Sequence, residues 1–134
     1  MVTPIRAASE AYRWTLSLPR MTSARATVGL DRLRSEIRRF VDERGWQRFH
    51  DPKNLAMAIA GEAGELAAEL QWLTPDEARA LTPDVRDRVV EEAADVLIYL
   101  LHLADVLEVD LVAEAAAKVE RNAQRFPAGG DRQA

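Results

Sequence analysis

Apolar residues recur every three or four positions through most of residues 28 to 125, with polar residues between them. This period places the apolar side chains on one face of an α-helix, and no run of alternating β-branched residues predicts a strand. The first periodic stretch predicts a helix that begins near residue 30 and stops at Gly45. Its apolar face consists of Leu30, Leu33, Ile37, Phe40 and Val41.

The segment FHDPKNL precedes a second helix, which is predicted from about residue 53 to residue 73. Asp51 can cap its amino end, and Pro52 suits the first helical turn, where a missing N–H group costs least. The apolar stripe of this helix consists of Leu55, Ile59, Ala63, Leu66 and Leu70.

Two Thr-Pro pairs in TPDEARALTPDV each combine a capping hydroxyl with a proline suited to the first helical turn. The first pair predicts only one or two turns, and the second predicts a long helix from about residue 83 to 108. Asp110 can cap a last helix, about 111 to 125, which Pro127 and the following glycines end. The predicted fold class is therefore all-α, a bundle of four main helices around one core.

The length of 134 residues suits one domain. We expect a flexible N-terminal arm over residues 1–26, the folded domain over 27–127 and a flexible tail over 128–134, with Met21 as an alternative start. The uncharged run VLIYLLHLA is far shorter than the ~20 residues that span a membrane. The first 20 residues lack the apolar stretch of a secretory signal. These features predict a soluble, cytoplasmic protein with no membrane partner.

Composition excludes several kinds of site. The formal net charge of -4 and the pI near 5.2 give no clustered basic surface for polymeric nucleic acid. Without cysteine there is no disulfide, no thiolate nucleophile and no cysteine-ligated zinc, and two histidines cannot form a histidine-rich metal site. Carboxylates are the remaining candidates for metal ligands.

Two acidic pairs lie at the edges of two apolar stripes. Glu62 and Glu65 are three residues apart on the second helix, and Glu92 and Asp95 have the same spacing on the long helix. Antiparallel packing of these helices would bring four carboxylates to one partly desolvated seam. A hard divalent cation with oxygen ligands, Mg²⁺ above all, would remove their repulsion and keep positions open for water and phosphates.

Other interpretations of the acids remain open at this point. Isolated Glu-x-x-Glu pairs usually lie on a solvated helix face, and such a face could belong to a noncatalytic interaction module for a basic partner. A di-iron carboxylate bundle would need Glu-x-x-His, which the chain lacks. The remaining acids of these segments are expected to be solvated or helix-stabilising charges: Glu69, Glu77, Glu91, Asp105, Glu108 and Glu114.

The order of four sequence blocks resembles a known family. GEAGELAAELQW followed by EEAADVLIYL is similar to the E-x-x-E, spacer, E-x-x-D pattern of the MazG-like all-α nucleotide pyrophosphohydrolases. The likeness extends to GWQRFHDPKNL upstream and KVERNAQRFP downstream, covers about residues 28 to 127, and looks closest to the dCTP pyrophosphatase branch. It implies Mg²⁺-dependent hydrolysis of a nucleoside triphosphate to the monophosphate and pyrophosphate, by a homo-oligomer that is typically a tetramer built from dimers.

By this resemblance the metal ligands are Glu62, Glu65, Glu92 and Asp95, in agreement with their helical spacing. Mg²⁺ would neutralise and orient the triphosphate for in-line attack, and Mn²⁺ could replace it. One acidic residue would also act as the catalytic general base. Glu65 is the first choice and Glu62 the second, because side-chain geometry decides this role.

The resemblance also implies a set of substrate contacts. Lys118, Asn122 and Arg125 fall on one face of the last helix and would reach phosphates and sugar, although basic residues near a helix carboxyl end are also ordinary dipole-stabilising decoration. The aromatic rings of two tryptophans would stack on the base, one histidine would bind its edge, and one tyrosine would contact the sugar: Trp46, Trp72, His50 and Tyr99. Packing in a core or a subunit interface is the alternative for the tryptophans, and packing is the expectation for His102.

Two rival functions follow from the same residues. One is the noncatalytic interaction module. The other is a related pyrophosphohydrolase acting on dUTP, phosphoribosyl-ATP or a broad set of triphosphates, although the aromatic pair and FHDPKNL favour dCTP or a modified dCTP. Self-association is expected for either kind of pyrophosphohydrolase, because one copy would leave apolar residues of the first and last helices without partners.

Overall fold

The computed structural model describes residues 29–128, which form an all-α fold. The elements in chain order are α2 (Leu30–Glu43), the short 3₁₀ helix η1 (Gln47–Phe49), α3 (Pro52–Leu70), α4 (Pro75–Arg79), α5 (Pro83–Val106) and α6 (Leu111–Arg125). No strand occurs within this span, so the predicted fold class is confirmed. The predicted arm over 1–26, the alternative start at Met21 and nearly all of the predicted tail lie outside the described residues.

The helix starts follow the capping chemistry of the sequence in three places. The Asp51 side chain accepts a hydrogen bond from the Asn54 N–H group at 2.9 Å and caps α3. Thr74 and Glu77 form a reciprocal capping box on α4, and Asp110 caps α6. At the second Thr-Pro pair the prediction is wrong in one detail, because Thr82 makes no side-chain cap hydrogen bond at the start of α5.

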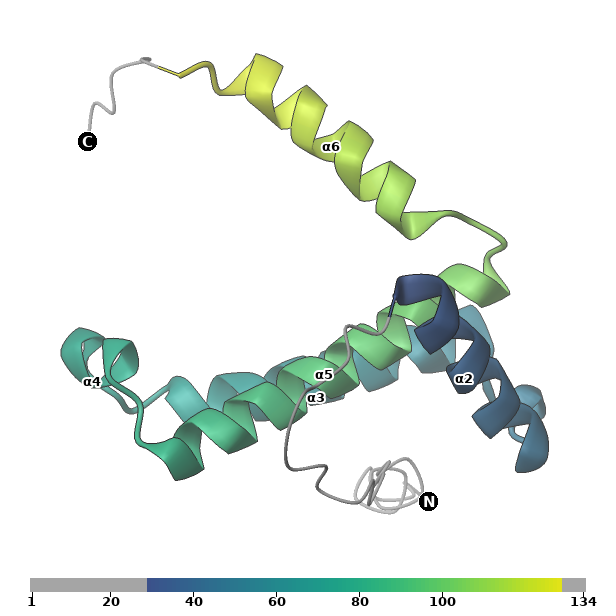
Figure 1. Cartoon of the computed structure of the whole chain (residues 1–134), viewed down its shortest axis with the longest axis horizontal. Coiled ribbons are helices and arrows are strands. Elements are labelled where there is room, and N and C mark those ends of the chain that lie inside the picture. The colour runs from purple at the N-terminus through teal and green to yellow at the C-terminus, as the bar shows by residue number, and fades with distance from the viewer. Residues whose placement is uncertain (1–28, 129–134) are drawn as a thin grey trace, which may run out of the picture.

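The long helices α3 and α5 run antiparallel and lie side by side, joined through the short α4 (Figure 1). Helix α2 packs against the carboxyl-terminal half of α5. The buried core joins these three helices near the amino end of α3 and consists of Ile37, Val41, Leu55, Tyr99 and Leu101. The acidic pairs therefore lie about one to three helical turns from the nearest core residue of their own helix, nearer the middle of the α3–α5 pair.

Helix α6 extends away from the α3–α5 pair (Figure 1). Its apolar side chains remain exposed, with exposed fractions of 53% for Val112, 66% for Val119 and 67% for Phe126. Met57 on α3 is 69% exposed.

No helix within residues 29–128 combines the length and the apolar character needed to cross a membrane.

Candidate metal and active site

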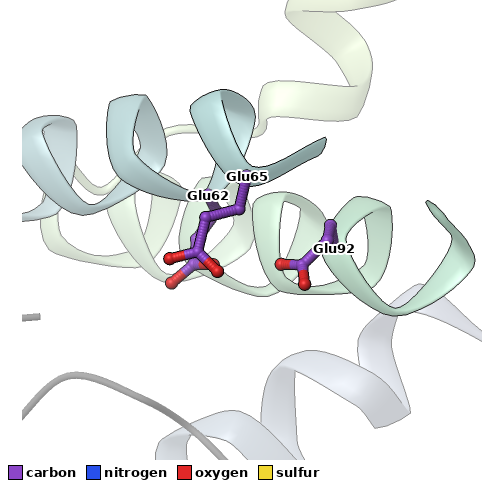
Figure 2. Close-up of side chains that lie close together, drawn as sticks. All are labelled: Glu62, Glu65 and Glu92. Carbon is purple, nitrogen blue, oxygen red and sulfur yellow. The ribbon is translucent and has the colours of Figure 1, made fainter. Parts of the chain in front are cut away.

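Three carboxylates from two helices meet at the middle of the α3–α5 pair. Glu62 and Glu65 project from α3 and Glu92 projects from α5, and one carboxylate oxygen of each lies within 4.8 Å of the others. Figure 2 shows the two α3 carboxylates side by side, with the Glu92 carboxylate turned toward them. Glu62 and Glu92 are partly buried and Glu65 is exposed. The helical spacing of the acids and the antiparallel packing together produce this cluster.

The donor set of the three glutamates suits a hard divalent cation. Two oxygens on opposite sides of one Mg²⁺ are about 4.2 Å apart, since each Mg²⁺–O distance is roughly 2.1 Å. The separations within the group therefore need only small side-chain rotations to close around an ion. All three donors are carboxylates, so the cluster fits Mg²⁺ or Mn²⁺ better than a metal that prefers nitrogen or sulfur.

Asp95, the fourth predicted ligand, lies outside the group of three but is electrostatically coupled to it. Burial raises the pKa of its carboxyl, and the negative charges of Glu91 and Glu65 raise it further. A carboxyl that is partly desolvated beside other carboxylates is stabilised in its ionised form by a cation. The structure thus brings three of the four predicted ligands together and leaves the fourth on the adjacent turn of α5.

An ion pair borders the acidic group on the side toward α4. The Nε atom of Arg88 on α5 lies 2.7 Å from Oε2 of Glu69 on α3. Arg88 precedes Glu92 by one helical turn, and Glu69 follows Glu65 by one turn. From the sequence, Glu69 was expected to be a solvated or helix-stabilising charge. The signal for the ion pair was Arg88, an opposite charge at the matching position of α5.

Two predicted base-binding residues lie together at the amino end of α3. The Trp46 ring is partly buried against the core and makes edge-to-face contacts with Phe40 and His50, at centroid distances of 5.8 and 6.4 Å. His50 is 5% exposed, and its Nδ1 lies 2.8 Å from Nε2 of His102. His102 was expected to be a packing residue, and in the structure it is buried and also contacts the His50 ring.

Trp72 lies at the opposite end of α3 and is 86% exposed. The 19 residues of α3 span about 28 Å at 1.5 Å per residue, so Trp46 and Trp72 of one copy cannot hold the same base. An indole with so large an exposed surface is available to a ligand or to another chain. The two tryptophans therefore belong to different ends of the molecule.

Tyr99 is a residue of the hydrophobic core. Its side chain is 1% exposed and packs in the cluster that contains Leu55 and Val41. The contact of Tyr99 with a sugar stays a prediction, since the ring is covered by the core of the single chain. The ring shares a helix with Glu92 and Asp95, but it turns into the core while they remain on the seam.

The predicted phosphate contacts of the last helix do not reach the acidic group within one chain. Lys118, Asn122 and Arg125 are exposed on α6, at the i, i+4, i+7 spacing of one helical face. Because α6 extends away from α3 and α5, these side chains lie apart from the three glutamates (Figure 1). A second copy of the chain is one way to bring the two sets together.

Asp105 was expected to be a solvated or helix-stabilising charge, and the structure shows instead that it pairs with another helix. Its side chain is only 9% exposed and accepts hydrogen bonds from two arginines of α2. Arg34 donates through Nη2 at 2.6 Å, and Arg38 donates through Nε at 2.7 Å. Hydrogen bonding to Arg38 is the main cause that lowers the pKa of Asp105, and Arg34 lowers it further. The four-residue spacing of the arginines was the signal in the sequence.

This fold and site define a class: an all-α protein in which two antiparallel helices present a carboxylate cluster suited to a divalent cation. No protein-family model matches the sequence. A pyrophosphatase from Archaeoglobus fulgidus DSM 4304 of known crystal structure is 37% identical, with a TM-score of 0.70, over 79% of this chain and 99% of that chain. The chain therefore belongs to the family of MazG-like pyrophosphatases.

Curated relatives narrow the similarity to one branch of this family. The chain is 44% identical to dCTP pyrophosphatase 1 of Mus musculus over 90 residues and to that of Homo sapiens over 91 residues. Each match covers 66% of this chain, with 53% of the mouse protein and 54% of the human protein. The chain thus spans about half the length of the curated relatives it matches.

Proposed function

We propose that this protein hydrolyses a nucleoside triphosphate, dCTP or a modified dCTP, to the monophosphate and pyrophosphate. The observation that carries the proposal is the convergence of Glu62, Glu65 and Glu92 from two helices within 4.8 Å. The proposed substrate follows the curated relatives, which are dCTP pyrophosphatases. The protein would act on the nucleotide pool of the cytoplasm.

The three glutamates and Asp95 would hold Mg²⁺, with Mn²⁺ as a substitute. When bound, the ion supplies positive charge that offsets the triphosphate and lowers the barrier to attack at phosphorus. The protein contributes the fixed placement of its carboxylates on two packed helices. Rigid helices limit the reorganisation that would otherwise accompany charge development in the transition state.

Glu65 is our choice for the general base. It is the exposed member of the acidic group, so a water molecule can approach its carboxylate without displacing protein atoms. Glu62 is the second choice and is partly buried. A Glu65→Gln variant that binds substrate at saturating Mg²⁺ but loses turnover would support the assignment, and turnover restored by saturating Mg²⁺ would make Glu65 a metal ligand alone.

We propose that the complete site forms between copies of the chain, in a tetramer built from dimers. Trp72 lies at the opposite end of α3 from Trp46, so the two rings of one copy cannot hold the same base. Helix α6, which carries Lys118, Asn122 and Arg125, extends away from the α3–α5 pair (Figure 1). The exposed apolar residues of α6 favour such an assembly. In the complete site the tryptophans and His50 would recognise the base, and the α6 residues would bind phosphates.

The experiment that tests this function measures pyrophosphate release from a panel of triphosphates. The panel contains dCTP, 5-methyl-dCTP, dUTP, phosphoribosyl-ATP and the common ribonucleotides, each with Mg²⁺ and with EDTA. Glu92→Gln should abolish release. Asp87→Asn is the control, because it removes a carboxylate charge from an exposed position of α5 outside the acidic group.

Each result of this panel has a distinct meaning. Preference for dCTP or 5-methyl-dCTP, lost with EDTA and with Glu92→Gln, would support the proposal as stated. Preference for dUTP, phosphoribosyl-ATP or many triphosphates would support the related pyrophosphohydrolase. If a folded, assembled protein released no pyrophosphate from any nucleotide, the proposed enzymatic activity would be wrong, and a noncatalytic interaction module would be favoured.

A further inference from the structure

The Glu69–Arg88 ion pair extends the acidic face of the α3–α5 pair by one helical turn. On α5, Arg88, Glu92 and Asp95 occupy positions i, i+4 and i+7 and share one face. On α3, Glu69 follows Glu65 by four residues on the matching face. Arg88 therefore lies one helical turn before Glu92 on the same face of α5, and its guanidinium is held by Glu69.

The ion pair uses only part of the guanidinium. Arg88 bonds Glu69 through Nε, and its two Nη groups donate no hydrogen bond to another residue within 29–128. The side chain of Arg88 is 51% exposed, and that of Glu69 is 26% exposed. A guanidinium has five donors in a planar fork that matches phosphate oxygens. An arginine oriented through Nε therefore keeps its terminal donors available for a second anion.

The surroundings of Arg88 favour an oxyanion as that second partner. The adjacent acidic group would bind a cation, and a cation held by carboxylates usually completes its coordination with water and substrate phosphates. The phosphates would then lie within a helical turn of a half-exposed guanidinium. A half-exposed ion pair by itself contributes little to stability, so helix cohesion alone gives Arg88 a small role.

We propose that Arg88 binds a phosphate group of the triphosphate or of the pyrophosphate product, and that Glu69 is the positioning residue that orients its guanidinium. This inference rests on the proposed function, because it names a further phosphate-binding residue of the same site. The Nη groups of Arg88 donate to phosphate oxygens while Nε keeps its bond to Glu69. No covalent step is assigned to either residue.

The test uses inorganic pyrophosphate with Mg²⁺ as the probe and isothermal calorimetry as the readout. Arg88→Ala should weaken pyrophosphate binding roughly tenfold or more, as expected for the loss of a charge-assisted hydrogen bond. Arg88→Lys should recover part of the loss, since lysine keeps the charge but not the fork. Glu69→Gln should weaken binding severalfold and raise KM for the nucleotide more than it lowers kcat.

Arg86→Ala is the matched control, because Arg86 is exposed on the same helix two residues away, on another face. It should leave pyrophosphate binding unchanged. Electron paramagnetic resonance measures Mn²⁺ binding without phosphate, and Arg88→Ala should bind Mn²⁺ as tightly as the wild type. The melting temperatures of Arg88→Ala and Arg86→Ala in EDTA should be the same.

Three outcomes would overturn the inference. If Arg88→Ala bound pyrophosphate as tightly as the wild type, Arg88 would not contact the phosphate. An equal loss in Arg86→Ala would make the effect one of net charge. A loss of Mn²⁺ affinity in Arg88→Ala as large as the loss of pyrophosphate affinity would mean that the ion pair only holds α3 and α5 in register. Failure of the proposed function is distinguishable, since the wild-type protein would then bind neither Mg²⁺-pyrophosphate nor nucleotide.

Discussion

The Nδ1 atom of His50 lies 2.8 Å from the Nε2 atom of His102, and this contact joins the segment before α3 to the carboxyl-terminal half of α5. The two rings meet edge to face with centroids 4.7 Å apart, and both are more than nine-tenths buried. One nitrogen must carry a hydrogen and the other a lone pair, so the contact cannot form between two protonated imidazoles. Protonation of both rings would place two positive charges side by side.

The histidine pair makes stability depend on pH. Burial, and then the charge of His102, lower the pKa of His50 from 6.5 to about 4, and burial lowers the pKa of His102 although Asp105 and Asp42 raise it. The unfolded chain therefore binds more protons below its pKa of about 6.5 than the folded chain. Stability should be full above pH 7 and should fall as the pH drops toward 4, by up to about 1.4 kcal/mol per pH unit for each histidine.

Urea unfolding between pH 7.5 and 4.5 measures this dependence. The double variant His50→Gln/His102→Gln has no titrating ring and should show a flatter profile over the same range. A wild-type profile as flat as that of the variant would mean that the histidines are protonated equally in both states.

Asp105→Asn should lower the free energy of unfolding by about 2 kcal/mol. The Asp105 carboxylate is 9% exposed and accepts hydrogen bonds from Arg34 and Arg38, and a charged hydrogen-bond partner contributes about 1.5–3 kcal/mol. Removing the charge leaves the two guanidinium groups of α2 without their carboxylate. Denaturant unfolding at pH 7 gives the value. Asp87→Asn, an exposed change on the same helix, should cost under about 0.5 kcal/mol; equal costs would contradict the network.

Glu65→Gln should change the effect of Mg²⁺ on thermal unfolding. Without metal, the variant should melt at or slightly above the wild-type temperature, because one of several neighbouring carboxylates is neutral. At a Mg²⁺ concentration 100 times the Kd, the wild type should gain about 2.7 kcal/mol, and the variant should gain much less. Scanning fluorimetry in EDTA and in Mg²⁺ compares the two. A wild type with no Mg²⁺ shift would exclude metal binding by the acidic group.

Val119→Glu should reduce the size of the assembly. Val119 is 66% exposed in the single chain, and its burial between copies would be opposed by a carboxylate that loses water without a partner. Sedimentation velocity should show a smaller species than the wild type, with helix content retained by circular dichroism. Glu120→Gln, at the neighbouring exposed position, should leave the assembly intact. An unchanged species in Val119→Glu would place the interface elsewhere.

The sequence by itself determined the helices and named four acids, of which three come together in the structure. The predicted first helix from residue 30 and the last from 111 to 125 begin where the structure has them, and the second and long helices end a few residues earlier than predicted. Periodicity, proline and cap residues such as Asp51 act within one or two turns, so a local reading suffices. The two acidic pairs follow from the same helical spacing, and family resemblance then supplied the chemistry.

The tertiary structure alone decided which side chains meet across the helices. The pair His50–His102 joins residues 52 positions apart, and the Arg34–Asp105 contact joins residues 71 apart. Burial of Tyr99 and exposure of Trp72 likewise depend on how α2, α3 and α5 pack. Such contacts are set by the rotation and register of one helix against another, which no periodicity within a single helix encodes. The sequence therefore named the helix faces, and packing decided what each face touches.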